Sequence, residues 1–557
     1  MKATRGQILF LAALLLFLGL FLIYPLAYIL VSSVVVDGRF TLAFFGMLIS
    51  DQAQWVAFLN STNLGLMVTL ATTVISIPLA YIMVRREFRG KGALSALILA
   101  PLVLPPFVGA VGMRQMFARF GSINLLLMET GIIDQPIDWF GGSGMTGVVV
   151  LEVLHLYPIM YLNVAAALAN IDPSLEEAAR NAGARGFTLF RRIVFPLFLP
   201  GYFAGASIVF IWAFTDLGVP LIFDYRQVVP IQIFDMLTQL HENPSGYTLV
   251  VVMIAMAMGL FYVTKSVIGG NRFEMMARGH VGSSIKRASK TETVLIYGFI
   301  LTVSATALIP HLSVIITSFS DRWVMTVLPE AYTTRFYGML LEHQLTASSI
   351  RNSIMLSGLS TVLDVIIGVS IAFLLVRTRI PGKSIIDTLT MLPLAVPGII
   401  IAFGYVAAFS GTWLDPRDNP VPLLIIAYAV RRLPYMVRSA YAGFQQINVN
   451  LEEAARNVGA GAVATLRRIT LPLIYSHILA GGLLCFSFAM LEVADSIILA
   501  FEEKYYPITK AIFTLLGRPD GAYIGCALGT MGMLLLMISL FLAHRFLGRK
   551  LGEIFRI

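Results

Sequence analysis

Apolar stretches of about 20 residues recur from one end of the chain to the other, and they limit its possible folds more than any other feature. Only 13% of the 557 residues are charged and 57% are hydrophobic, whereas a water-soluble protein of this length carries roughly 25% charged residues. In lipid, a helix satisfies its own backbone groups, so stretches of this length predict membrane-crossing helices. The sequence therefore predicts an all-α polytopic membrane protein without a large soluble domain.

About twelve spans can be placed along the chain, six in each half. The predicted spans lie near residues 8–31, 62–84, 95–117, 146–169, 200–222, 248–268, 293–319, 353–376, 386–410, 421–443, 476–500 and 524–547. The first stretch is long enough to cross and has no small-residue cleavage site at its end, so we interpret it as a retained helix rather than a signal peptide.

The distribution of Lys and Arg predicts how these spans are oriented. With the N-terminus inside, most of the 40 basic residues fall in inside loops, which is the bias of cytoplasmic loops. The same bias accounts for the net charge of +9 without nucleic acid as a partner. We therefore expect cytoplasmic N- and C-termini, and a basic cytoplasmic linker, residues 269–292, between a first half (1–268) and a second half (293–557).

One charged segment occurs twice in this apolar chain. LEEAARNAGA begins at Leu175, and LEEAARNVGA begins 276 positions later at Leu451. Further pairs at an offset of 276 or 292 are Pro158 with Pro434, Pro196 with Pro472, Asn60 with Asn352, Arg85 with Arg377, and Pro101 and Pro105 with Pro393 and Pro397. Six spans in each half make the repeats parallel, which predicts a pseudo-twofold axis along the membrane normal and a pathway between the halves.

Each copy of the repeated segment predicts a short cytoplasmic helix with defined ends. Asp172 and Asn448 hold the N-cap positions, and acidic residues follow in the first turn, where the helix dipole favours them. Gly183 and Gly459 are placed to end the helices in a left-handed turn. A second short helix should follow the first copy and stop near Pro196.

The predicted helix also has a narrow stripe of small apolar residues. Leu175, Ala178, Ala179 and Ala182 follow the spacing of one helix face. Such a stripe suits docking into a groove of another protein, although it also suits packing under its own bundle. Two equivalent helices about a twofold axis favour a twofold partner.

The motifs EEAARNAGA and EEAARNVGA resemble the EAA loop of importer-type ATP-binding-cassette permeases, in which Glu-Ala-Ala is followed by Gly and then by a basic and apolar run that ends near Pro. The resemblance covers nearly the whole chain and implies a type I importer permease fold with EAA loops at residues 172–197 and 448–473. The fused two-half layout resembles permeases for ferric iron, and thiamine and aminoethylphosphonate permeases are built similarly. The residues that would couple to the ATPase are Glu176, Glu177, Ala178, Ala179 and Gly183, and Glu452, Glu453, Ala454, Ala455 and Gly459.

The resemblance also implies the partners of the chain. They are two ATP-binding-cassette ATPase subunits and a periplasmic solute-binding protein, in the inner membrane of a bacterium. Gly382-Lys383-Ser384 lacks the first glycine of a phosphate-binding loop, so we expect no ATP hydrolysis and no bound cofactor here, with ATP and Mg on the partner ATPase. Ferric iron is the expected substrate, and thiamine, aminoethylphosphonate or a polyamine are the alternatives.

Ionisable residues inside predicted spans are costly, so they mark a translocation pathway or a buried ion pair. The pathway candidates are Asp216, Glu492, Asp495, Arg431, Arg432, Glu152 and His155. Carboxylates suit a hard cation such as ferric iron, whereas simple ion pairing would only fix helix packing. A single histidine such as His155 near the Pro158 kink is more typical of a structural hydrogen bond than of a metal site. The Pro-rich run from Pro101 predicts a kinked or broken helix.

Two other classes of function fit the composition less well. A secondary transporter driven by an ion gradient would also have twelve spans and parallel halves, but it would not need two matched coupling helices. No Ser/His/Asp set or His-rich motif supports a membrane enzyme. The two cysteines, Cys485 and Cys526, support neither a disulfide framework nor a metal cluster.

Overall fold

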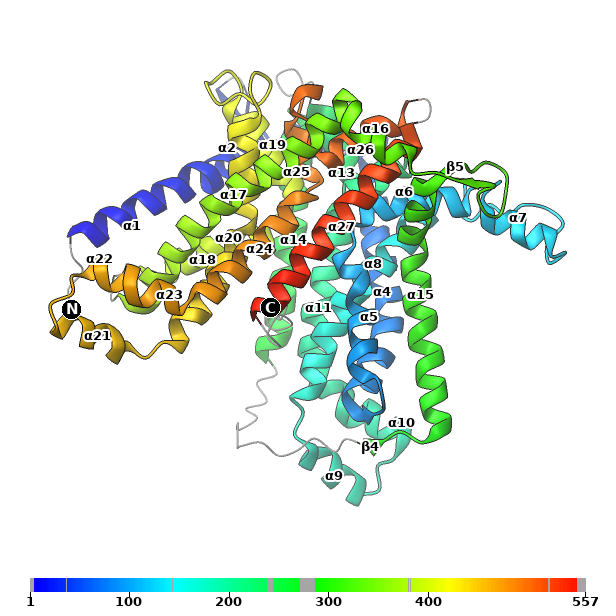
Figure 1. The fold of residues 1–557 in the computed structure, drawn as a ribbon, viewed down its shortest axis with the longest axis horizontal. Coiled ribbons are helices and arrows are strands. Elements are labelled where there is room, and N and C mark those ends of the chain that lie inside the picture. Colours follow the sequence, from blue (N-terminus) through cyan, green and yellow to red (C-terminus); the bar gives the residue numbers. More distant parts are fainter. Residues whose placement is uncertain are drawn as a thin grey trace. The chain divides into compact units, whose positions relative to one another are not determined.

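A computed structural model describes residues 5–36, 38–142, 144–237, 244–270, 286–378, 380, 382–518 and 521–547 (Figure 1). Helices dominate the described residues, and the strands have only two or three residues each, which confirms the all-α fold class. The chain forms two compact units: unit 1 holds residues 1–48, 233–251 and 334–555, and unit 2 holds residues 49–232 and 252–333 with the last two residues.

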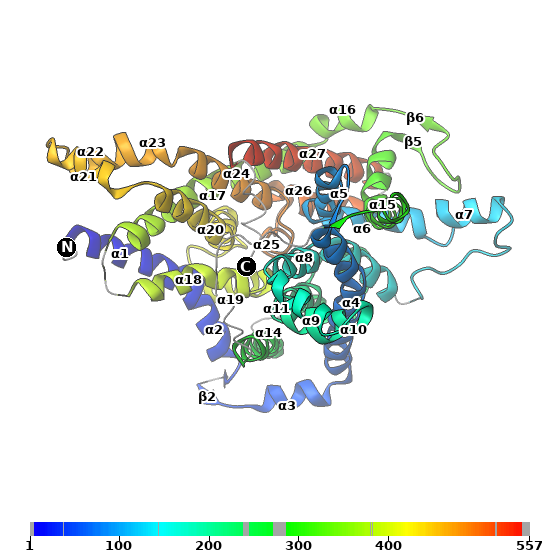
Figure 2. The same cartoon turned by 90° about the horizontal axis from the view of Figure 1, so that it is seen from below.

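Unit 2 is built around three long helices that contact one another, α4, α8 and α11 (Figure 2). Its elements are α4 Gln52–Arg85, β3 Arg86–Glu87, α5 Lys91–Val103, α6 Pro106–Phe117, α7 Ser122–Glu129, α8 Met145–Ala169, α9 Pro173–Asn181, α10 Gly186–Leu189, a π-helical turn Phe190–Val194, α11 Phe195–Thr215, α12 Gly218–Ile222, β4 Lys286–Arg287, α15 Lys290–Phe319, β5 Ser320–Arg322 and β6 Ala331–Tyr332. Three helices, α3 Ala43–Ser50, α13 Val229–Met236 and α14 Ser245–Gly270, belong partly to each unit.

Unit 1 repeats this core with α17, α20 and α24, which also contact one another. Its elements are α1 Arg5–Leu18, a π-helical turn Gly19–Ile23, α2 Tyr24–Ser32, β1 Val35–Val36, β2 Arg39–Phe40, α16 Arg335–Glu342, α17 Gln344–Arg377, α18 Lys383–Ala395, α19 Gly398–Phe409, α20 Val421–Gln446, α21 Val449–Asn457, α22 Ala462–Thr465, a π-helical turn Leu466–Thr470, α23 Leu471–Leu473, α24 Tyr475–Met490, α25 Ala494–Leu499, a 3-10 turn Glu503–Tyr505, α26 Ile508–Leu516 and α27 Gly521–Leu547.

The first predicted span of each half packs with the other half. The first span of residues 1–268 lies in unit 1, which otherwise holds mostly second-half residues, and the first span of residues 293–557 lies in unit 2. In unit 1, Leu14 and Leu18 of α1 share a hydrophobic cluster with Ile371 of α17 and Val437 of α20. In unit 2, α15 lies so close to α6 that a Cβ on Gly112 would stand 1.9 Å from the carbonyl oxygen of Pro310. The compact units therefore cut across the predicted halves 1–268 and 293–557, and part of the predicted linker lies outside the described residues.

Among the described residues, eight helices are long and apolar enough to cross a membrane, and three pairs of bent helices bring the number to 11. The bends are 92° between α5 and α6, 103° between α18 and α19, and 71° between α23 and α24. The remaining predicted span is α20, a 26-residue helix in which Arg431, Arg432 and Arg438 lower the hydropathy. The break after α5 confirms the prediction from the Pro-rich run at Pro101.

One local prediction is wrong. The second short helix of the first half does not stop near Pro196 but runs into α11 without a break. The N–H of Phe195 reaches back five residues to the carbonyl of Phe190, and this π-helical turn absorbs the hydrogen bond that a proline cannot make. The second half has the same turn, where Leu471 donates to Leu466, but there the chain does bend two residues after Pro472.

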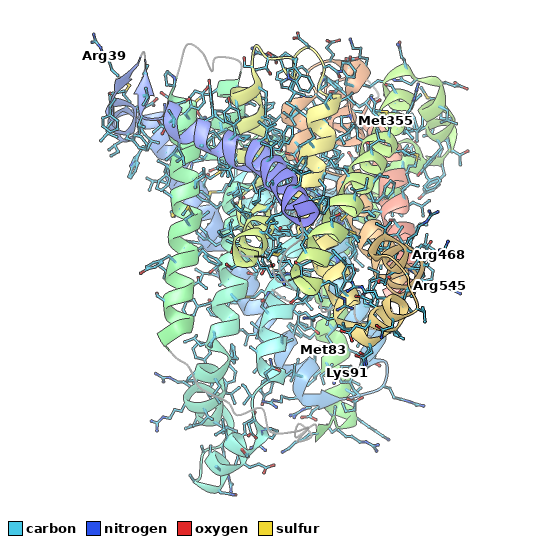
Figure 3. All side chains as sticks on the ribbon, turned by 90° about the vertical axis from the view of Figure 1, so that its left-hand side faces the viewer. Arg39, Met83, Lys91, Met355, Arg468 and Arg545 are labelled. Carbon is cyan, nitrogen blue, oxygen red and sulfur yellow. The ribbon has the colours of Figure 1, made fainter. Side chains whose placement is uncertain are left out.

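Labelled residues locate the ends of each unit (Figure 3). In unit 2, Met83 and Lys91 lie at the same end as α9, where β3 pairs in parallel with β4 and joins α4 to the start of α15. In unit 1, Arg39 lies at the opposite end from Arg468 and Arg545. The side of the membrane that each end faces stays a prediction.

Candidate functional site

The two repeated segments form the short capped helices that the sequence predicts, α9 in unit 2 and α21 in unit 1. The Asp172 carboxylate accepts a hydrogen bond from the N–H of Ser174 at 2.9 Å, and the Asn448 side chain accepts one from the N–H of Asn450 at 3.0 Å. Hydrogen bonds from Ser174 hold the pKa of Asp172 below its usual value. Gly183 and Gly459 have φ values of +90° and +92°, so both helices end in the left-handed turn that favours glycine.

A buried ion pair fixes each helix to a long span. Glu176 of α9 pairs with Arg85, the last residue of α4, and Glu452 of α21 accepts a hydrogen bond from Nε of Arg377, the last residue of α17, at 2.9 Å. The two glutamates are only 2% and 4% exposed. Sequence reasoning missed this contact: it placed Glu176 in the first turn of the helix and among the residues that would couple to the ATPase, although Arg85 and Arg377 were already matched in the repeat.

The rest of each short helix faces outward. Glu177 and Ala178 are exposed on α9, and Glu453 and Ala454 are exposed on α21. Leu175 and Leu451 keep 41% and 49% of their surface exposed. Ala179 is half-buried, whereas its mate Ala455 is buried. Each unit therefore presents a Leu and Ala surface with acidic neighbours.

The opposite ends of α4 and α17 also carry matched contacts. Asn60 donates to the carbonyl of Gln227 at 3.1 Å, and its mate Asn352 donates to the carbonyl of Lys504 at 2.9 Å. The next residue in each case, Ser61 or Ser353, accepts from a backbone N–H at 2.8 Å. The same two contacts thus hold the loop that follows the fifth span of each half.

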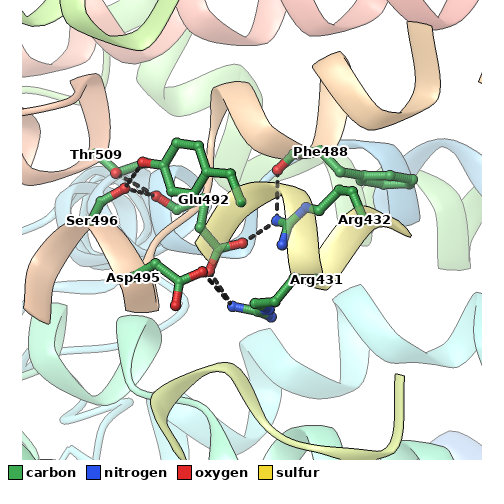
Figure 4. A network of polar contacts seen from close by, with 8 residues as sticks. Arg431, Arg432, Phe488, Glu492, Asp495, Ser496 and Thr509 are labelled. Atoms are coloured by element: carbon green, nitrogen blue, oxygen red, sulfur yellow. Dashed lines mark hydrogen bonds and ion pairs between the residues drawn. The ribbon is translucent and has the colours of Figure 1, made fainter. Parts of the chain in front are cut away.

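Between these matched ends, unit 1 contains a buried cluster of opposite charges (Figure 4). Arg431 of α20 contacts Glu492 at 2.5 Å and Asp495 of α25 at 3.3 Å. Arg432 pairs with the other oxygen of Glu492 and donates to the carbonyl of Phe488 at 2.8 Å. Two guanidinium groups thus neutralise two buried carboxylates, so the structure brings together four of the seven pathway candidates.

Arg431 also occupies the bend of a broken span. A Cβ on Gly398, the first residue of α19, would stand 1.9 Å from Nη1 of Arg431. The guanidinium therefore fills the space that the glycine leaves at the break between α18 and α19. Any larger residue at 398 would displace it from Glu492.

One buried acid of this cluster was missed in the sequence analysis. Asp364 of α17 is 1% exposed and lies near Arg432 and the thiol of Cys485. It occupies the position of Thr72 in the first half. The signal was available, because Asp364 is an ionisable residue inside the predicted span 353–376.

Unit 2 contains a different polar cluster at the corresponding place. Asp216 follows the last residue of α11, and its Oδ2 accepts a hydrogen bond from the N–H of Val219 in α12 at 2.7 Å. Glu152 of α8 lies within hydrogen-bonding reach of the Asp216 carboxyl. Glu152 is 2% exposed, and its Oε1 has no hydrogen-bond partner. Unit 2 thus places two carboxyl groups near one another here, of which Glu152 is buried and Asp216 is half-buried.

His155 serves the bend between α5 and α6 instead of joining the two acids. Its Nδ1 lies 2.9 Å from the carbonyl oxygen of Pro101. In a continuous helix that carbonyl would accept from residue 105, but Pro105 has no N–H to donate. A second histidine, His311 of α15, lies with Nε2 3.2 Å from the carbonyl of Pro105. In the part of the chain that the structure describes, no group of three or more His, Cys, Asp or Glu side chains is placed to hold a metal ion.

Comparisons with known proteins agree with this geometry. The family described as binding-protein-dependent transport system inner membrane component matches the chain twice, at residues 72–269 and 364–553. The chain is 28% identical to the putative ferric transport system permease protein FbpB 1 of Haemophilus influenzae, over 90% of this chain and 79% of that protein. It is 27% identical to the ferric transport system permease protein FbpB of Actinobacillus pleuropneumoniae, over 97% of this chain and 78% of that protein. It is also 28% identical to the molybdenum transport system permease protein ModB of Escherichia coli, over 38% of this chain and 92% of that protein.

Proposed function

The chain belongs to the family of binding-protein-dependent transport system inner membrane components, and on this premise we propose that it is the permease subunit of an ATP-driven importer. Two separate ATPase subunits dock on α9 and α21 from the cytoplasm, and a periplasmic solute-binding protein delivers the substrate. The observation that carries the proposal is the matched pair of short helices, each anchored by a buried Arg–Glu pair and each exposing Leu and Ala.

The anchoring suggests how force would pass from the ATPase into the membrane. A push on α9 acts through Glu176 on Arg85, and therefore on the end of α4. With a rise of 1.5 Å per residue, the 34 residues of α4 extend over about 50 Å. Because Asn60 holds a loop at the opposite end, a displacement of α9 reaches both ends of the span. The same path runs from α21 through α17.

Ferric iron is the substrate that we propose. Two relatives that match about 90% or more of this chain are named as ferric transport permeases, one of them as putative, and carboxyl oxygens such as those of buried Glu152 are suitable ligands for a hard cation. A second candidate is molybdate, since the molybdenum permease ModB is a relative over about a third of the chain. An oxyanion would need free cationic groups, and the guanidinium groups of Arg431 and Arg432 are already paired with acids.

Site-specific cross-linking between the short helices and the ATPase tests this proposal. Ala178→Cys and Ala454→Cys each add an exposed thiol to a chain whose two cysteines are buried. Both variants are expected to form cross-links with the co-expressed ATPase. Trp413→Cys is the control, because Trp413 is 88% exposed in a loop predicted to face the periplasm. Cross-linking at 413, or at neither helix, would contradict the proposed docking.

A further inference from the structure

The charged cluster of unit 1 contains one buried acid more than its two arginines neutralise, and that acid is Asp364 of α17. The side chains of Arg431 and Arg432 are bonded to the other two acids of the cluster. Asp364 is 1% exposed, and neither of its carboxylate oxygens accepts a hydrogen bond from the residues that the structure describes. A buried polar group without a partner is costly, so its presence calls for a reason.

The packing of three helices places Asp364 beside Arg432. The C-terminal ends of α17 and α20 are joined by a hydrogen bond, and further back a Cβ on Gly368 of α17 would stand 2.7 Å from Cγ of Met436 of α20. Asp364 lies one turn before Gly368, and Arg432 lies one turn before Met436, so the acid and the base start from the same level of facing helices. Helix α24 closes this junction, because Sγ of Cys485 donates to the carbonyl of Arg432 at 3.5 Å.

Arg432 has a hydrogen-bond donor left over for this acid. Its Nη2 is bonded to Glu492 and to the carbonyl of Phe488. Its Nε is buried and has no hydrogen-bond partner among the described residues. A guanidinium group carries its N–H donors in a fork that matches the two oxygens of a carboxylate. An unused donor of Arg432 and two unused acceptors of Asp364 therefore lie at the same helix junction.

The first half lacks both members of this arrangement. Thr72 stands at the position of Asp364, and Leu156 stands at the position of Arg432. The Thr72 hydroxyl donates to the carbonyl of Val68 in its own helix at 2.8 Å, so it needs no partner on another helix. The acid and the base are thus present together in one repeat and absent together from the other, which favours a joint role.

We propose that Arg432 is a positioning residue with two partners, Glu492 in the present arrangement and Asp364 after α24 has moved. Glu492 lies in the break at residues 491–493 between α24 and α25, whereas Asp364 and Arg432 lie inside uninterrupted helices. Breaks at the ends of helices are where hinge motions are absorbed. When the break moves, the guanidinium passes from Glu492 to Asp364 while Glu492 keeps Arg431, so no buried charge is left without a counterion.

The inference deepens the proposed function and rests on it, because the movement would come from the docked ATPase. The π-helical turn that follows the docking helix α21 is tied to it, since the Thr470 hydroxyl donates to Glu452 at 3.2 Å. This turn continues through α23 into α24, and Glu492 follows the far end of α24. A push on α21 therefore reaches the Glu492 contact, and the second partner lowers the free energy needed to open it in each transport cycle.

The test measures ATP-driven uptake and thermal unfolding of the complete complex of this chain, its ATPase and its binding protein, with ferric iron on the binding protein. Asp364→Thr installs the first-half residue, whose hydroxyl can bond within its own helix. We expect uptake into lipid vesicles to fall by about tenfold while the thermal midpoint is not lowered, because Asp364 holds nothing in the present arrangement. Asp364→Glu keeps a carboxylate and should retain more uptake. The control Ser360→Ala, one turn earlier on α17, removes a buried hydroxyl that bonds only its own helix and should leave uptake within about twofold.

A double-mutant cycle tests whether Asp364 acts through Arg432. In a chain that already carries Arg432→Leu, the further change Asp364→Thr should alter uptake by less than about twofold, because the guanidinium that would use the acid is gone. A further tenfold loss in the double variant would mean that Asp364 acts on something else, and the inference would fall.

Three other results would overturn the inference. They are normal uptake by Asp364→Thr, a lowered thermal midpoint in that variant, which indicates a structural carboxyl, and uptake by Asp364→Glu that is no better than that of Asp364→Thr. Failure of the proposed function has a separate signature, because then the unaltered complex itself shows no ATP-dependent uptake.

Discussion

The two halves of the chain agree at both ends of their long second spans and differ between those ends. At one end Arg85 and Arg377 hold the short helices, and at the other Asn60 and Asn352 hold matching loops. In the middle, unit 1 buries Glu492 between two guanidinium groups, whereas unit 2 has the buried Glu152 and the half-buried Asp216. The difference teaches that the repeat is preserved where the short helices and loops are held, and has diverged at the predicted pathway residues between those ends.

The largest effect is expected when the carboxylate that compensates two buried guanidinium groups of unit 1 is removed. Glu492→Gln leaves Arg431 and Arg432 without their shared carboxylate and is expected to destabilise unit 1 by about 3–5 kcal/mol, because an uncompensated buried charge remains. The control variant Glu492→Asp keeps a carboxylate beside both guanidinium groups and should cost less. Reaction of a thiol probe with buried Cys485 and Cys526 during heating measures the stability of unit 1. Equal losses in both variants would mean that the missing negative charge is not the cause of the destabilisation.

The next largest effect is expected at the ion pairs that hold the short helices α9 and α21 in the two halves. Arg377→Met leaves buried Glu452 without an ion-pair partner among the described residues and is expected to loosen α21 by about 3 kcal/mol. Arg85→Met leaves buried Glu176 with only the partly exposed Arg180, so it is expected to loosen α9 by less. ATP hydrolysis should then continue with little transport. The ratio of solute moved to ATP hydrolysed measures the loss of coupling. Hydrogen exchange shows whether α9 or α21 has loosened. The double variant Arg85→Glu with Glu176→Arg is expected to restore part of the coupling, and no restoration would argue against the ion pair as the link.

A smaller effect is expected at the two glycine turns. Gly183→Val and Gly459→Val force a β-branched residue into φ values near +90°, which costs about 1–2 kcal/mol per site. Open space surrounds both glycines, so the cost is conformational rather than steric. We expect similar partial uncoupling from both variants in the ratio of transport to ATP hydrolysis. Unchanged coupling in either variant would show that the turn does not set the docking geometry.

The smallest effect is a difference between the N-caps of α9 and α21 in their response to acid. The pKa of Asp172 is lowered by hydrogen bonds from Ser174, so its capping contribution is present above the unfolded pKa and is lost as the pH falls through the folded pKa. Asn448 makes the same contact without a charge and does not titrate. Hydrogen exchange, corrected for intrinsic rates, should show α9 opening in acid while α21 stays closed. Asp172→Asn should remove this difference, and an unaltered acid response would assign it to another group.

Local sequence signals predicted the spans, the repeat and the caps of α9 and α21. They also predicted the break at Pro101, because proline acts on its own helix. They failed where the answer depends on which distant segments meet: the Arg85–Glu176 pair, the meeting of Glu152 with Asp216, and the exchange of first spans between the units. The wrong stop at Pro196 has a local cause, since a π-helical turn can absorb a proline that would otherwise end a helix.

Transport by reconstituted vesicles tests the central claim, which is that this chain moves solute only when a separate ATPase acts on its two short helices. Vesicles with the chain, the ATPase and the loaded binding protein are expected to accumulate ferric iron when ATP is supplied, and vesicles with the chain alone are expected to accumulate none. Uphill accumulation by the chain alone under an ion gradient, without nucleotide, would contradict the account and identify a secondary transporter.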